Sequence, residues 1–226
     1  LFKTHHHSLN KSLGTWSGRI TSVLRYLYNR KGPLSLSINQ SGGYINWNSK
    51  HHYPNLQIYF NPLTYSITHK NKRPLLKTDK FNGFIIGYNS CRPKSLGKVT
   101  LKSPNFDDTP MINPNFLSHE EDIYDVKCAI NFSKVLANTN NIKKIRNESV
   151  THDLLNATEE EMIDHFKSNA VSIYHPCGTC KMHEDPKKGV VSERLKVHGM
   201  ENLWIADASV FPNITSGNIN APVMML

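Results

Sequence analysis

The sequence predicts an α+β fold in which a mostly antiparallel sheet is backed by helices. Short stretches at residues 56–60 and 98–102 alternate apolar and polar side chains, as strands with one solvent-facing side do. Two longer stretches, at 119–137 and 158–170, repeat apolar residues at helical spacing. The 226 residues are enough to bury a sizeable core.

The composition is that of an ordinary globular protein, with 38% hydrophobic and 20% charged residues. The formal net charge is +9, but the basic residues form small clusters without interleaved aromatic side chains, so we expect no nucleic-acid partner. No apolar run approaches the roughly 18 residues that cross a bilayer. The four cysteines do not form a disulfide framework, which favours a cytoplasmic or membrane-peripheral location over secretion and leaves the compartment open.

The N-terminal part holds one clear helix between two expected loops. Residues 1–14 have few apolar positions and are interpreted as a connecting loop. From Ser17 apolar residues recur at helical spacing up to Gly32-Pro33, which are stop signals for a helix. Residues 33–53 contain Gly42-Gly43 and many Ser and Asn, which is typical of a loop.

Three short strands are expected next. Residues 56–60 and 84–88 are followed by 98–102, where Val99 and Leu101 are predicted to point inward and the intervening Lys and Thr side chains outward. A strand of this kind has one buried and one solvated face. This pattern favours an antiparallel sheet.

Two helices follow, and a capping box marks the start of each. The box Ser118-His-Glu-Glu121 opens the helix predicted over 119–137, and Thr158-Glu-Glu-Glu161 opens the helix predicted over 158–170. In such a box the hydroxyl accepts a hydrogen bond from the amide three residues later, and the Glu carboxylate accepts one from the capping residue.

The last 56 residues, 171–226, are dense in Gly, Pro, His and Cys. One stretch, Leu203-Trp-Ile-Ala206, has the character of a buried strand that ends at Asp207. Loops after strand ends are where open α/β sheets bind ligands. The functional site is therefore expected in this part of the chain.

The densest cluster of reactive side chains is Tyr174-His-Pro-Cys-Gly-Thr-Cys-Lys-Met-His183. Two His and two Cys are zinc-ligand types, but all four lie within nine residues, whereas structural zinc sites usually draw ligand pairs from separated segments. Cys177 and Cys180 could be a redox pair, but the flanking sequence lacks the strand and helix that such a pair needs. We expect no metal.

His175 is the candidate general base of this segment, because imidazole titrates near neutral pH. The following Pro176 restricts the backbone of His175 to extended conformations and so fixes its direction. The alternative is an ordinary, partly buried loop histidine. The loop Ser216-Gly-Asn-Ile-Asn220 adds amide side chains that bind polar ligands, unless Asn218 and Asn220 only satisfy their own backbone in Asx turns.

Five segments resemble, in the right order, the C-terminal region of the glucose/methanol/choline (GMC) family of FAD-dependent alcohol oxidoreductases. The resemblance covers nearly all of residues 15–226 and is most specific in the last 56. Within the family, the sequence is most similar to the choline and aliphatic alcohol dehydrogenases. The segments are Cys91-Arg-Pro-Lys-Ser-Leu-Gly-Lys-Val-Thr-Leu-Lys-Ser103, Ile112-Asn-Pro-Asn-Phe-Leu117, Tyr174-His-Pro-Cys-Gly-Thr-Cys-Lys-Met182, Leu195-Lys-Val-His-Gly199 and Trp204 to Pro222.

The resemblance implies a substrate-binding domain over 15–170 and a catalytic, flavin-contacting segment over 171–226 that returns to an FAD-binding domain. It implies oxidation of a small-molecule alcohol to an aldehyde or ketone, by a dehydrogenase or an oxidase. Hydride passes to flavin N5 while His175 acts as the base, and Asn218 occupies the position of the family's second active-site residue. Oxygen, a quinone or another carrier then accepts the electrons.

The resemblance also assigns contacts with the cofactor. Asp207 and Ala208 match the segment that touches the FAD diphosphate and ribityl chain. Asn218 and Asn220 match positions beside the isoalloxazine ring, and Tyr174 is expected to pack near the flavin.

The sequence departs from the family pattern at three places. His183 follows Met182 where Gly is usual, and Val190-Val-Ser-Glu193 stands where Asp-Pro is common. No Gly-x-Gly-x-x-Gly fingerprint occurs, so the nucleotide-binding half is expected upstream, on a longer polypeptide of which this chain is a fragment. Alone, such a fragment should not bind FAD tightly and should be inactive. The alternative is a non-catalytic fragment or binding module that lacks its flavin half.

Overall fold

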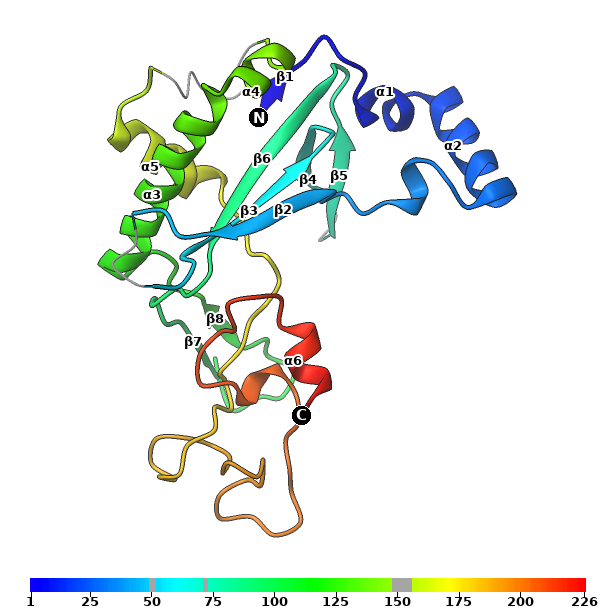
Figure 1. Ribbon diagram of the computed structural model, residues 1–226. Coiled ribbons are helices and arrows are strands. Elements are labelled where there is room, and N and C mark those ends of the chain that lie inside the picture. The colour runs from blue at the N-terminus through cyan, green and yellow to red at the C-terminus, as the bar shows by residue number, and fades with distance from the viewer. Residues whose placement is uncertain (49–51, 71–72, 148–155) are drawn as a thin grey trace. The chain divides into compact units, whose positions relative to one another are not determined.

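The computed structural model describes residues 1–48, 52–70, 73–147 and 156–226 (Figure 1). These residues form two compact units. Unit 1 comprises Leu1–Asn89 and Val126–His165, and unit 2 comprises Ser90–Asp125 and Phe166–Leu226. The architecture is mixed α+β with antiparallel strand pairs and helices, as the sequence predicts.

Unit 1 is built on a four-stranded sheet and a separate hairpin. The strand order in the sheet is β1-β6-β3-β2, with β1 antiparallel to β6 and β2 antiparallel to β3. The hairpin pairs β4 with β5. The strands are β1 Phe2–Lys3, β2 Ser41–Ile45, β3 Leu56–Asn61, β4 Tyr65–Lys70, β5 Arg73–Thr78 and β6 Gly83–Ser90.

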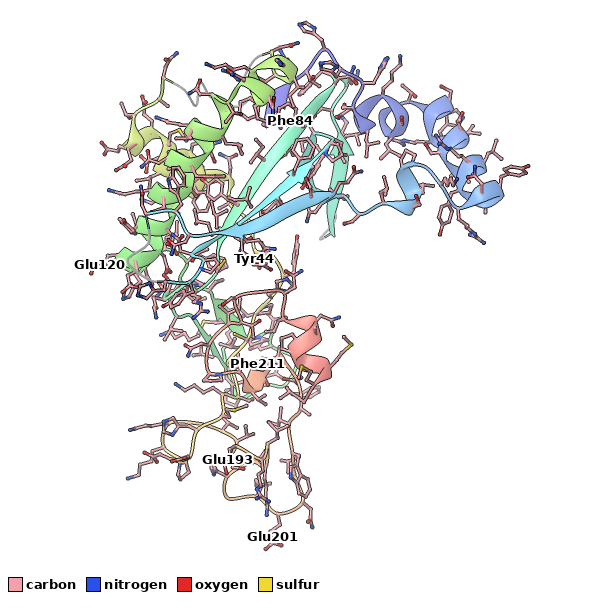
Figure 2. The ribbon with its side chains drawn as sticks, viewed as in Figure 1. Tyr44, Phe84, Glu120, Glu193, Glu201 and Phe211 are labelled. Atoms are coloured by element: carbon pink, nitrogen blue, oxygen red, sulfur yellow. The ribbon has the colours of Figure 1, made fainter. Side chains whose placement is uncertain are left out.

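The long helix α3 (Glu120–Ala137) packs its unit 1 part against the sheet. Cys128 and Ala129 on α3 form a buried cluster with Leu56 of β3, and half-buried side chains of β2, β3 and β6 surround them. A second cluster joins Phe2, Phe84 and Ala137 (Figure 2 labels Phe84). The Phe2 and Phe84 rings stack with their centroids 5.3 Å apart. These two clusters bury the helix-facing side of the sheet.

The expected helices are present, and the expected loops contain additional short elements. The helix after Ser17 is confirmed as α2 (Trp16–Asn29), followed by the single turn η1 (Pro33–Ser35). The segment 1–14 is not only a loop, because it contains β1 and α1 (Leu9–Gly14). The Gly-rich part of 33–53 contains β2. A two-residue strand, a six-residue helix of less than two turns and a strand with two adjacent glycines show no side-chain periodicity, so the sequence pattern does not reveal them.

The two capping boxes have different outcomes. At α5 (Glu159–Asn169) the box is confirmed, because the Glu161 carboxylate accepts from the Thr158 amide at 2.8 Å and Thr158 Oγ1 accepts from the Glu161 amide at 3.3 Å. At α3 the box over Ser118 is not formed. His119 Nδ1 instead accepts from the Glu121 amide at 3.2 Å, because the helix begins at Glu120.

Asn10 on α1 is a buried polar clamp within unit 1. Its Nδ2 donates to the carbonyl oxygen of Thr64 at 2.7 Å, to Thr64 Oγ1 at 3.1 Å and to the carbonyl oxygen of Asp79 at 3.2 Å. Its Oδ1 accepts from the Thr64 amide at 2.9 Å. Both Asn10 and Thr64 are buried, so the amide group satisfies backbone groups that water cannot reach. Asn10 thereby joins α1 to the residues that border β4 and β5.

Unit 2 has little regular structure. It contains the antiparallel pair β7 (Lys98–Thr100) and β8 (Met111–Asn113), the turn η2 (Ala208–Val210) and the short helix α6 (Asn220–Met224). The carboxylate of Asp122, in the first turn of α3, is buried and accepts from the amides of Lys94 and Ser95 at 2.7 and 2.8 Å. This carboxylate holds the chain that leads into β7.

Two expectations about buried strands in unit 2 are wrong. Val99 and Leu101, predicted to point inward, are 49% and 82% exposed. Leu203-Trp-Ile-Ala206 is not a buried strand, because Trp204 forms only a single β-bridge, to Lys196, and its side chain is exposed. The apolar patterns are real, but the described residues of unit 2 supply no surface that covers these side chains.

Candidate active site

The segment that carries His175 is attached to the segment that follows Asp207. The Gly178 amide donates to the Ala208 carbonyl oxygen at 3.4 Å, Cys180 donates to Ser209 at 2.9 Å, and Met182 donates to Val210 at 2.8 Å. These backbone bonds place residues 178–182 beside η2. The structure therefore shows that two segments of the sequence-predicted site, residues 178–182 and residues 208–210, lie side by side.

A second layer of the chain supports this pair of segments. The amide of His183 donates to the carbonyl oxygen of Val191 at 3.0 Å, and the amide of Val190 donates to that of Lys181 at 2.9 Å. Val191 and Val210 are fully buried and are the apolar centre of an otherwise loop-built region. The position of residues 178–182 is therefore fixed from both sides.

His175 lies in the loop that precedes residues 178–182, and its side chain is half-buried. No hydrogen bond to the imidazole exists within the described part of the chain. The preceding Tyr174 is mostly exposed and has φ of 62°, in the left-handed region that a residue with a side chain seldom adopts. The sequence carries no signal for this conformation.

Gly178 also has a left-handed backbone, with φ of 86°. A side chain there would be strained, and its Cβ would lie 3.3 Å from the Phe211 carbonyl oxygen (Figure 2 labels Phe211). This glycine lets the chain turn from His175 into the segment bonded to η2.

Asp207 caps η2. Its Oδ1 accepts from the Ser209 amide at 2.7 Å. The pKa of the Asp207 carboxyl lies below its usual value because the Ser209 hydroxyl and amide both donate to it. Ala208, next along the chain, is half-buried and accepts at its carbonyl from Gly178 and Phe211. Asp207 is thus an exposed anion whose local role is to shape this turn.

Asn218 and Asn220 lie farther along the chain, before and at the start of α6, and both are exposed. Ile219 between them is buried, and Thr215 Oγ1 donates to the Gly217 carbonyl oxygen at 2.8 Å. Among residues 156–226, no hydrogen bond joins Asn218 to His175, and neither amide forms the Asx turn considered as the alternative. Their convergence with His175 stays a prediction.

The other ligand-type residues of the segment have local roles. His183 Nδ1 accepts from the Asp185 amide at 2.9 Å, and His198 Nε2 lies 2.9 Å from the His183 carbonyl oxygen. Cys177 and Cys180 are free, half-buried thiols. In the described ranges, no group of three or more His, Cys, Asp and Glu side chains is arranged to hold a metal ion.

The thiol chemistry of Cys177 gives a testable prediction. Burial raises the pKa of the Cys177 thiol, so its thiolate population at neutral pH is smaller than that of a free thiol. In a Cys180→Ser background we expect slow iodoacetamide labelling of Cys177 at pH 7, measured by peptide mass spectrometry, and faster labelling as the pH rises. Rapid labelling at pH 7 that does not increase with pH would contradict this and would support a redox role.

Comparisons with known proteins agree with this architecture. Residues 93–226 match the model of the family described as GMC oxidoreductase. The chain is 33% identical over 207 residues to the alcohol dehydrogenase (acceptor) of Pseudomonas putida, covering 92% of this chain and 36% of that protein. It is 31% identical over 201 residues to the oxygen-dependent choline dehydrogenase of Cronobacter sakazakii, covering 89% of this chain and 35% of that protein. The chain thus spans about a third of the length of these relatives.

Solved structures show the same fold. The formate oxidase of Aspergillus oryzae RIB40, as its R554A variant, superimposes with a TM-score of 0.82 at 23% identity, covering 98% of this chain and 42% of that one. A fungal aryl-alcohol oxidase superimposes with a TM-score of 0.59 at 22% identity, covering 76% of this chain and 26% of that one. The family match, the related sequences and the shared fold lead to one conclusion: the chain belongs to the GMC oxidoreductase family.

Proposed function

We propose that this chain is the substrate-binding and catalytic C-terminal part of an FAD-dependent alcohol oxidoreductase. The reaction is oxidation of a small-molecule CH–OH group to an aldehyde or ketone, with oxygen, a quinone or another carrier as the final electron acceptor. The observation that supports this most directly is the backbone ladder, the three backbone hydrogen bonds that hold residues 178–182 beside η2. These residues begin three residues after the proposed base, and η2 is the turn that is proposed to contact the cofactor.

The residues present fit one side of a bound flavin. The His175 imidazole is accessible and has no internal hydrogen bond among the described residues, and the amides of Asn218 and Asn220 are exposed. Tyr174 adds an exposed aromatic ring. The two amides and the aromatic ring can donate to or stack on a flavin without a charge to desolvate. FAD, supplied mainly by an FAD-binding half of the same polypeptide, would provide the electron sink.

His175 acts on the substrate hydroxyl in this proposal. A neutral imidazole takes the hydroxyl proton and so increases alkoxide character at the carbinol carbon as hydride leaves. The left-handed turn at Tyr174 and the bonded segment that begins at Gly178 hold His175 on both sides along the chain. Such positioning lowers the entropic cost of reaching the reactive geometry.

Asp207 and Ala208 are proposed to face the cofactor through their backbone. A carboxylate directly beside a diphosphate would be repulsive, and the Asp207 side chain already accepts from Ser209. We infer that Asp207 shapes η2 so that the turn can approach the cofactor, and that Asn220 and Tyr174 lie nearer the isoalloxazine ring.

Asn218 orients the substrate hydroxyl by hydrogen bonding. The Asn218→Ala variant of the flavin-bearing polypeptide should lose about tenfold to 100-fold in kcat, less than a variant that removes the base, because an amide positions the substrate but transfers no proton. Steady-state kinetics measure this effect. The exposed Asn213→Ala is the matched control and should leave kcat within about twofold. An unchanged kcat in Asn218→Ala would remove Asn218 from the proposal.

The test of the proposed function is an absorption spectrum of the natural polypeptide that contains residues 1–226. Its flavin band at about 450 nm should bleach on anaerobic addition of a substrate alcohol. Because the relatives are an alcohol dehydrogenase and a choline dehydrogenase, simple alcohols and choline are the first compounds to try. A polypeptide without a flavin band would favour the alternative, a non-catalytic binding module, which the partial coverage of the relatives keeps open.

A further inference from the structure

The net positive charge of this protein comes from its first third, because that part has no acidic residues. Residues 1–78 contain 11 Lys and Arg and no Asp or Glu, whereas residues 79–226 contain 16 Lys and Arg and 18 Asp and Glu. The whole net excess of +9 therefore originates before Asp79. A region of one sign of charge attracts surfaces of the opposite sign.

Helix α2 lies in this basic region and presents its apolar face to solvent. Its most buried residue is the polar Ser22, whose hydroxyl donates to the Gly18 carbonyl oxygen at 2.7 Å. Gly18 lies one turn earlier on the same side, where a Cβ would clash with the Ser12 carbonyl of α1. The small, polar side of α2 thus faces the protein.

The opposite side of α2 carries six large apolar side chains, each between 45% and 92% exposed. At 3.6 residues per turn they form one continuous stripe. An amphipathic helix on a soluble domain normally has the reverse orientation, with its apolar stripe against the core. Figure 1 shows α2 in unit 1 beside α1 and beyond the strands. The apolar stripe consists of Trp16, Ile20, Val23, Leu24, Leu27 and Tyr28.

Exposed cations flank this stripe. Arg19 and Arg25 lie on the helix, and Arg30 and Lys31 follow directly after it. Arg30 caps the C-terminal end, where its amide donates to the Tyr26 carbonyl oxygen. Trp16 and Tyr28 stand near the two ends of the stripe, and such amphipathic rings favour the boundary between lipid and water. The helix is about 21 Å long at 1.5 Å per residue.

We propose that the apolar stripe of α2 binds the surface of an anionic lipid bilayer. The helix lies in the plane of the interface, with the apolar side chains in the acyl boundary and the cations among the headgroups. None of the described helices is long and apolar enough to cross a membrane. A protein surface that covers α2 would explain the apolar stripe but not the absence of acidic residues from the first 78 positions. An anionic lipid surface explains both observations.

The experiment measures vesicle binding of the natural polypeptide that contains residues 1–226. Flotation compares phosphatidylcholine vesicles with vesicles that contain about 30% phosphatidylglycerol. We expect binding to the anionic vesicles, weakened when NaCl is raised from about 0.05 to about 0.5 M, because salt screens the attraction to the headgroups. Brominated lipids should quench Trp16, and the Trp16→Phe variant should lose that quenching.

Variants test whether α2 is the binding element. The double variant Leu24→Ser with Leu27→Ser should bind at least about tenfold more weakly, because it removes apolar area from the stripe without changing charge. Its matched control is Leu101→Ser with Phe106→Ser, two exposed apolar residues of unit 2. Arg25→Gln with Lys31→Gln should weaken binding and reduce its salt dependence, and Lys143→Gln with Lys144→Gln on α4 (Asn140–Ile145) is its control. The four residues replaced in the two α2 variants are all exposed, so circular dichroism should show that both variants fold normally.

Three results would overturn the proposal. One is a wild-type polypeptide that does not bind anionic vesicles, which is the outcome if the remainder of the polypeptide covers the stripe. The second is vesicle binding that α2 variants and control variants reduce equally. The third is a dimer in sedimentation analysis that Leu24→Ser with Leu27→Ser dissociates while vesicle binding is unchanged, which would assign the stripe to a second copy.

Discussion

Replacing His175 with alanine in the flavin-bearing polypeptide is expected to lower kcat by about 100- to 10,000-fold, the range that removal of a general base produces. The cofactor should remain bound, because the backbone ladder between residues 178–182 and η2 does not involve the imidazole. Stopped-flow measurement of flavin reduction by the alcohol, with the absorption spectrum of the same sample, separates the two effects.

The control for this variant is His6→Ala, an exposed histidine of unit 1 outside the site. It should leave the rate of flavin reduction within about twofold. Added imidazole should restore part of the activity of His175→Ala, since a free base can enter the space left by the side chain, but should have no effect on Asn218→Ala. A His175→Ala variant with the turnover of the wild type would refute the catalytic assignment.

The second large effect is expected on stability. Asn10→Ala removes the donor of three hydrogen bonds and the acceptor of two more, from the Thr64 amide and the Ser8 hydroxyl, and it leaves the buried Thr64 amide without a partner. Because a buried, unsatisfied backbone group carries a full desolvation penalty, the free energy of unfolding should fall by about 3 kcal/mol. Urea denaturation followed by circular dichroism measures this change.

Lys11→Ala, the exposed neighbour on α1, is the matched control and should change the free energy of unfolding by less than about 0.5 kcal/mol. Asn10→Asp keeps the shape of the side chain but removes its hydrogen-bond donor, so it tests the two contributions separately. A carboxylate keeps the acceptor for Thr64 but cannot donate to the two carbonyl oxygens, so it should be as destabilising as alanine or more so. Equal stability of all three variants would contradict the role of Asn10 as a clamp.

Sequence patterns predicted the longer elements well. The helical spacing after Ser17 and behind Thr158, and the alternation over 56–60, correspond to α2, α5 and β3 because each pattern extends over enough residues to define a period. The hairpin β4–β5 and the elements within 1–14 were not predicted. β5 has no alternation of apolar and polar residues, and the single polar clamp of Asn10 in α1 leaves no periodic signal.

The predicted orientation of apolar residues was less accurate than the predicted elements. Val99 and Leu101 alternate as a buried strand does, and both are exposed in unit 2. A sequence records that an apolar face will be covered but not by what, so a face covered from outside this chain has the same pattern as a core strand. The apolar stripe of α2 is a second instance, with the spacing of a core-facing helix and the opposite orientation.

Part of the candidate site could be predicted from its motifs. The segments that contain His175 and Asp207 were singled out from residue types, and the structure attaches them to each other through Gly178, Cys180 and Met182. The left-handed conformation of Tyr174 was not predicted, because tyrosine has no preference for it. The proximity of Asn218 to His175 stays a prediction, because no hydrogen bond among the described residues connects the two side chains.

The burial of Asn10 has a consequence for the biosynthesis of the protein. Asn10-Lys-Ser12 is an acceptor sequence for N-linked glycosylation, and the nitrogen that would carry the sugar is the same Nδ2 that donates to Thr64 and Asp79 inside unit 1. A glycan at this nitrogen and the native fold exclude each other. In a host that routes the chain through a glycosylating compartment, every molecule modified at Asn10 before α1 docks would be lost to misfolding, whereas the exposed Asn213 acceptor carries no such conflict.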